Sequence, residues 1–117
     1  MCVCTLSAGE WQERFAVASA ARAKGNELYG EKKFADAAAE YDKSWVHLDR
    51  IVKPTPEQRR EVNAMKVVVA LNLAQAKLKL GMYRDVIEHC NQVLTRQAEN
   101  VKGLFRRSKA YAALCWT

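Results

Sequence analysis

The chain has 117 residues, half of them apolar, with only two prolines and five glycines, and this composition favours a single all-helical domain with a substantial hydrophobic core. No apolar run reaches the roughly 20 residues of a membrane span, and the N-terminal stretch is too short and too weakly apolar for a signal peptide, so we expect a soluble, cytoplasmic protein. The net charge of +6 points to an acidic partner: nucleic acid, an anionic membrane surface or an acidic peptide.

The first predicted helix begins at Ser7 and ends near Gly30. Ser7 and Glu10 have the spacing of a capping box, in which each side chain bonds the backbone of the other. Apolar residues then recur at steps of three and four, as on one face of a helix. Gly25 lies within this helix, where a glycine costs roughly 1 kcal/mol against alanine and usually marks close approach of a second helix. Residues 31–33 form the predicted turn.

The second predicted helix runs from residue 34 to about 52, where the sequence KPTP at 53–56 ends it. Thr55 is a favourable N-cap for the next helix, and Gln58 completes a capping box. We therefore expect a third helix over 56–80. Its first half is polar and should project beyond the body of the fold.

The fourth predicted helix covers 83–96, and Asn100 is the expected cap of a fifth helix that runs to the end of the chain. No helix follows the fifth, so its packing face should be exposed. Because a repeat helix cannot bury its face alone, we expect swapping or homodimerisation through this last helix. The chain is interpreted as a truncated array, either a piece of a longer one or a natural short form.

Residues 67–100 form a helix–turn–helix unit of 34 residues, and residue 101 begins a similar first helix again. This period is typical of the tetratricopeptide repeat (TPR). Ala74 and Ser108 stand 34 positions apart at the small-residue position of that repeat, whereas Gly25 precedes Ala74 by 49. About fifteen residues are thus inserted between the first and second repeats.

Helix 34–52 carries the aromatic–alanine–aromatic pattern of the second repeat helix at Phe34, Ala37 and Tyr41. With the inserted residues and the segments LNLAQAKLKL and VKGLFRR, the chain resembles the TPR domain of large immunophilins and related chaperone-binding co-chaperones. The resemblance implies an all-α fold of antiparallel helix–turn–helix repeats in a right-handed solenoid. The expected solenoid comprises two full repeats, 7–53 and 54–100, and the first helix of a third, 101–117.

In such solenoids the first helix of each repeat lines the concave face. Arg22 and Asn26 are one turn apart on one such helix, Asn72 lies on the next, and Lys102 and Arg106 are one turn apart on the third. Cations and amide groups of this kind bind carboxylates by charge-assisted hydrogen bonds. The set resembles the dicarboxylate clamp of chaperone-binding repeat domains, with arginine at position 22 where lysine is usual.

Three further residues, Tyr29, Gln75 and Lys79, are predicted to extend this groove along the same helices. Trp11 and Trp45 are interpreted as packing residues, because they lie on the apolar stripes of their helices. Isolated basic residues elsewhere are interpreted as a solvated face.

The resemblance implies a protein–protein interaction module that binds the acidic C-terminal tail of heat shock protein 90 or 70, as a co-chaperone. The alternative is a TPR scaffold that binds another helix or self-associates through its groove or its exposed last helix. Nucleic acid binding is not expected, because the chain has no recognised RNA-binding motif and its aromatic residues lie mainly on packing stripes.

No enzymatic function is expected, because the sequence has neither a glycine-rich phosphate loop nor a paired-carboxylate constellation. Any prolyl isomerase domain would lie outside this chain. No cofactor or metal is expected either, since the cysteines and histidines lack zinc spacing. These residues are Cys2, Cys4, Cys90, Cys115, His47 and His89.

Overall fold

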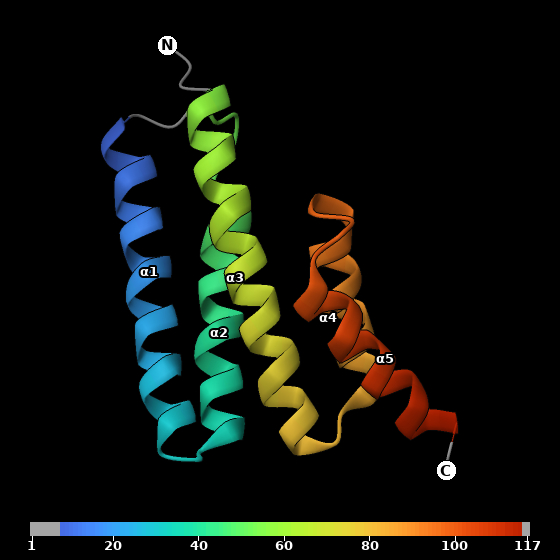
Figure 1. The fold of residues 1–117 in the computed structure, drawn as a ribbon. Coiled ribbons are helices and arrows are strands. Elements are labelled where there is room, and N and C mark those ends of the chain that lie inside the picture. The colour runs from blue at the N-terminus through green and yellow to red at the C-terminus, as the bar shows by residue number, and fades with distance from the viewer. Residues whose placement is uncertain (1–7, 116–117) are drawn as a thin grey trace.

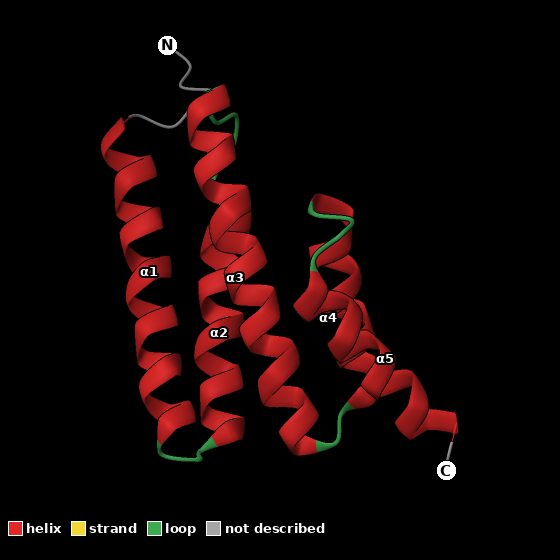
Figure 2. Cartoon of the chain, viewed as in Figure 1, coloured by secondary structure: helices red, strands yellow, loops and turns green. Residues whose placement is uncertain are grey.

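The computed structural model describes residues 8–115, and this part of the chain consists of helices joined by short turns, without a β-strand (Figure 2). The helices are α1 (Ala8–Gly30), α2 (Phe34–Asp49), α3 (Pro56–Leu80), α4 (Tyr83–Arg96) and α5 (Val101–Cys115). The all-α prediction is confirmed. Ser7, the expected cap of the first helix, lies outside the described residues.

Successive helices pack against one another in the order of the chain, α1 on α2, α2 on α3, α3 on α4 and α4 on α5. Figure 1 shows that α1 and α2 form one antiparallel pair and α3 and α4 a second, with α1 and α3 running in the same direction. Further contacts join α1 to α3 and α3 to α5. The first helices of the repeats are therefore neighbours in space, as in a helical-repeat solenoid.

Local sequence signals set the start and end of α3 and the start of α5. The Thr55 hydroxyl accepts from the backbone N–H of Gln58 at 3.1 Å, and the Gln58 side chain accepts from the N–H of Thr55 at 3.0 Å, which confirms the predicted capping box at the start of α3. Gly81 ends α3 with a φ of 76°, a left-handed conformation that glycine adopts without strain. At the start of α5, Asn100 Oδ1 accepts from the N–H of Gly103 at 2.8 Å, as predicted.

The predicted end of the second helix, near residue 52, was wrong by about one turn, because α2 ends at Asp49. The backbone N–H of Ile51 bonds the carbonyl of Leu48, three residues back, so the last turn tightens. Ile51 is then buried in the core at 8% exposure, and Lys53 takes a φ of 50°. Burial of Ile51 turns the chain toward α3 before the KPTP segment is reached.

The α1–α2 pair is joined by small residues and by one buried hydrogen bond. A Cβ at Gly25 would stand 2.6 Å from Cε1 of Tyr41, so the glycine allows the Tyr41 ring to lie against α1. The Ser44 hydroxyl donates to the carbonyl of Ala18 at 2.7 Å, and both residues are fully buried. The close helix approach predicted at Gly25 is confirmed.

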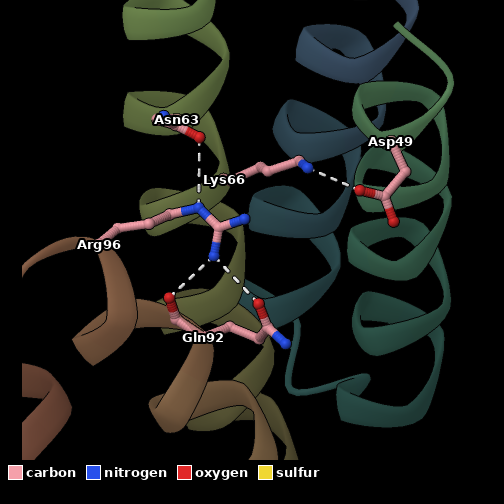
Figure 3. A network of polar contacts seen from close by, with 5 residues as sticks. All are labelled: Asp49, Asn63, Lys66, Gln92 and Arg96. Atoms are coloured by element: carbon pink, nitrogen blue, oxygen red, sulfur yellow. Dashed lines mark hydrogen bonds and ion pairs between the residues drawn. The ribbon is translucent and has the colours of Figure 1, made fainter. Parts of the chain in front are cut away.

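A polar network holds the extended first half of α3 against its neighbours (Figure 3). Lys66 pairs with Asp49 at 2.6 Å, and Arg96 Nε donates to Asn63 Oδ1 at 3.3 Å. Both cations also lie near the ring of Trp45, Lys66 Nζ at 5.2 Å and Arg96 Cζ at 5.6 Å from its centroid. Trp45 therefore joins α2, α3 and α4, which confirms its packing role.

Trp11 also has the packing role expected of it, because its ring stacks on that of Phe15 with centroids 5.1 Å apart. Among residues 8–115, no helix has both the length and the apolar character needed to cross a membrane. Within the same range, no three His, Cys, Asp or Glu residues gather as metal ligands would.

Candidate functional site

A small pocket of about 130 Å³ lies where the first helices of the repeats meet. It is lined by Asn26, Tyr29, Tyr41, Asn72, Gln75 and Arg106. These side chains come from α1, α2, α3 and α5, so the pocket depends on the stacking of the repeats. Three of the five predicted clamp residues and two of the three predicted extensions are brought together here.

The two asparagines and Tyr41 form one hydrogen-bonded cluster. The Tyr41 hydroxyl donates to Asn26 Oδ1 at 2.6 Å, and Asn72 Nδ2 donates to the same oxygen at 3.4 Å. Burial raises the pKa of the Tyr41 hydroxyl, the nearby Tyr29 raises it further, and Arg22 partly offsets both. The phenol is therefore neutral at physiological pH and remains a hydrogen-bond donor.

Arg106 connects α5 to α3. Its Nη1 donates to the carbonyl of Leu71 at 3.1 Å, which places the half-buried guanidinium beside Asn72 in the pocket wall. No ion pair to Arg106 forms within the described part of the chain. The guanidinium has five N–H donors, so most of them remain for a ligand.

Lys102 lies one turn before Arg106 on α5. Its side chain is exposed, and among residues 8–115 it has neither a hydrogen bond nor an ion pair. It does not line the pocket. Its stem is long and flexible, so the ammonium group is not fixed in one position.

Arg22 lies in a neighbouring pocket of about 350 Å³ rather than with Asn26. This second pocket is lined by Phe15, Arg22, Glu61, Ala64, Met65 and Val68 of α1 and α3. The Nε of Arg22 is buried and has no hydrogen-bond partner among the described residues. The two pockets adjoin along the same helices, since Arg22 precedes Asn26, and Val68 precedes Asn72, by one turn.

Lys79, the third predicted extension, is exposed and lines neither pocket. Tyr41 is the pocket residue whose polar role the sequence did not reveal, because its position on the apolar stripe of α2 indicated packing alone. The available signal was its hydroxyl. A buried tyrosine hydroxyl usually has a hydrogen-bond partner, and Gly25 predicted the helix contact that supplies one.

The outer face of α5 carries exposed apolar side chains. Val101 is 76% exposed, Phe105 61%, Tyr111 50% and Leu104 40%. In the described part of the chain, only Gly103 and Ala110 of this helix are buried. The exposed face predicted for the last helix is confirmed.

No protein-family model matches the chain. Similar proteins include two peptidyl-prolyl cis-trans isomerases of Arabidopsis thaliana and one human peptidyl-prolyl cis-trans isomerase. Identity is 36% over 92 residues to PASTICCINO1 and 34% over 105 residues to FKBP42, both of Arabidopsis thaliana, and 30% over 105 residues to human FKBP4. The alignments cover 79%, 88% and 88% of this chain, but it spans only 14%, 29% and 22% of those relatives.

Two solved structures share the fold. A multi-domain immunophilin from Arabidopsis thaliana superposes with a TM-score of 0.82 at 32% identity, over 94% of this chain and 45% of that one. The C-terminal TPR-containing domain of a Plasmodium falciparum FK506-binding protein superposes with a TM-score of 0.80 at 22% identity, over 86% of this chain and 67% of that one. The chain is a tetratricopeptide-repeat domain that resembles the repeat domain of large immunophilins.

Proposed function

We propose that this domain binds the acidic C-terminal peptide of a heat shock protein 90 or 70 chaperone, as a co-chaperone module of the cytoplasm. The observation that carries the proposal is the pocket in which Asn26, Asn72 and Arg106 converge from three successive first helices. A terminal aspartate presents two carboxylates, and the side chains of Asn26, Asn72 and Arg106 offer the matching N–H donors.

The proposed mechanism is binding without catalysis. The N–H groups of Asn26 and Arg106 would bond one carboxylate within the pocket. Lys102 would approach from the rim, and Arg22 from the adjoining pocket, as the flanking cations of the clamp. The relatives are isomerases, yet this chain spans less than a third of each, so any isomerase reaction would belong to a domain outside it.

The test is calorimetric titration with a peptide ending in Glu-Glu-Val-Asp, as the free acid and as the C-terminal amide. The free acid should bind at least about tenfold more tightly, because the amide removes one charge-assisted contact. Its affinity should also fall as salt is raised, since the contacts are largely ionic. Equal binding of the two peptides would reject recognition of the terminal carboxylate.

A second candidate function is self-association through α5, favoured by the exposure of Phe105 and Tyr111 on its outer face. Light scattering after gel filtration over a range of concentrations decides it. A dimer that dissociates on dilution, and that Phe105→Lys prevents, supports this function. A monomer at every concentration rejects it.

A further inference from the structure

The carbonyl oxygen of Asn26 is fully occupied by its neighbours. It accepts from the Tyr41 hydroxyl at 2.6 Å and from Asn72 Nδ2 at 3.4 Å. An amide oxygen has two lone pairs, so both are used. The only hydrogen-bonding group that Asn26 has left is its NH₂, which can donate but not accept. The side-chain amide of Asn26 therefore presents its NH₂, and not its oxygen, to the pocket.

Tyr41 is held firmly enough to impose this orientation. The side chain is only 2% exposed, and its ring fills the space beside Gly25, where an added Cβ would stand within 3.0 Å of three ring atoms. Such a ring cannot shift without moving α1 or α2. Of the two hydrogen bonds that Asn26 Oδ1 accepts, the one from the Tyr41 hydroxyl is the shorter and therefore the stronger.

We infer that Tyr41 is a positioning residue for the groove: its hydroxyl locks the amide of Asn26 so that only N–H donors face the pocket. The site then selects carboxylate or carbonyl oxygens and disfavours ligand groups that donate. Without the hydroxyl, the amide can rotate by half a turn and present its carbonyl, which repels an anion. The inference deepens the proposed function and rests on it for the ligand, but the orientation of Asn26 can be measured without one.

The first experiment compares Tyr41→Phe with Tyr83→Phe. Tyr41→Phe keeps the ring against Gly25 and removes only the hydroxyl. Tyr83→Phe is the matched control, because within residues 8–115 no hydrogen bond from the Tyr83 hydroxyl is formed and the residue lies outside the pocket. Circular dichroism and urea unfolding establish that each variant is folded.

Both variants are titrated with the Glu-Glu-Val-Asp peptide as free acid and as amide. Tyr41→Phe should bind the free acid about fivefold more weakly, the usual effect of one hydrogen bond. It should lose less affinity for the amide, whose uncharged carbonyl makes a weaker bond to the Asn26 NH₂. Tyr83→Phe should match the wild type with both peptides. A purely structural effect of Tyr41 would weaken both peptides equally. Unchanged binding of the free acid by Tyr41→Phe would overturn the inference.

The second experiment measures the orientation of the Asn26 side-chain amide by nuclear magnetic resonance in the protein without ligand. In the wild type, the NH₂ protons of Asn26 should show only weak Overhauser contacts with the ε protons of Tyr41, because the oxygen faces the hydroxyl. In Tyr41→Phe, the Asn26 NH₂ signals should shift or broaden as the amide rotates. Strong contacts in the wild type, or unchanged signals in a folded variant, would overturn the inference. Failure of the wild type to bind the free acid would reject the proposed function alone.

Discussion

The ring of Tyr41 occupies the space that a side chain at Gly25 would need. A Cβ on Gly25 would lie 2.6 Å from Cε1 and 2.7 Å from Cδ1 of Tyr41, and the ring is buried at 2% exposure. Gly25 therefore sets how closely α1 and α2 approach. Since the hydroxyl of the same ring bonds Asn26, this one contact also fixes a wall of the pocket.

Gly25→Ala should lower the free energy of unfolding. Overpacking of a tight contact costs about 1–3 kcal/mol, and the higher helix propensity of alanine returns only about 1 kcal/mol. Gly30→Ala is the control, because no atom of the described residues lies within 4 Å of a Cβ built there. Urea unfolding should show Gly25→Ala as the less stable of the two. A Gly25→Ala protein as stable as Gly30→Ala contradicts the prediction.

Lys102→Ala should weaken binding of the acidic peptide without changing stability. The side chain is exposed and has no hydrogen bond or ion pair within the described residues, so the fold loses nothing when it is removed. The peptide loses a charge-assisted contact, which corresponds to about tenfold or more in affinity. Lys109→Ala on the same helix is the control: Lys109 lies 5.5 Å from the centroid of Phe105 and does not line the pocket. Equal affinities of the two variants in calorimetry would rule out a clamp role for Lys102.

Asn100→Ala should reduce both stability and peptide affinity. Asn100 caps α5, and loss of a cap costs about 1 kcal/mol. Lys102 and Arg106 lie on that helix, so its fraying should cost affinity although Asn100 is outside the pocket. Thr55→Ala removes the comparable cap of α3 in a segment away from the pocket. It should lower the urea midpoint without lowering affinity, and a parallel loss of affinity would argue against the coupling.

His89 should make the fold less stable in mild acid. Burial lowers its pKa below 6.5, Lys77 lowers it further, and three carboxylates partly offset this. These are Asp42, Asp85 and Glu88. The unfolded chain therefore takes up the proton more readily, so stability is complete above about pH 6.5 and falls as the pH drops toward the folded pKa.

His89→Gln removes this dependence. Urea unfolding at about pH 7 and about pH 5 measures the difference in stability between wild type and variant. The free energy of unfolding of the wild type should fall relative to that of the variant at the lower pH. A difference that stays constant between the two conditions would show that His89 does not titrate differently in the folded and unfolded states.

The starts of α3 and α5 could be predicted because the signals that set them are local. The capping box at Thr55 and the cap at Asn100 depend on residues three positions away, and the structure contains both. The end of α2 could not be predicted in this way. It depends on the burial of Ile51 in a core formed by distant residues, which no neighbouring residue reveals.

The sequence predicted which residues share a face of each helix, but not which residues of another helix they contact. Spacing of one turn correctly indicates that Arg22 and Asn26 share a face of α1, yet they line different pockets because different residues of α3 oppose them. Asn26 opposes Asn72, whereas Arg22 opposes Val68 and the apolar residues before it. Helical periodicity contains no information about which residue lies opposite on another helix.

The sparse burial of α5 has a thermodynamic consequence for any ligand of the groove. With only Gly103 and Ala110 buried among its described residues, α5 should open from α4 at a lower free energy than global unfolding. Lys102 and Arg106 are in place only while the helix is docked, so the apparent affinity is the intrinsic affinity multiplied by the docked fraction. A ligand that spans the groove should in turn slow amide hydrogen exchange in α5, and a mutation that only strengthens the α4–α5 contact should tighten binding without touching the ligand.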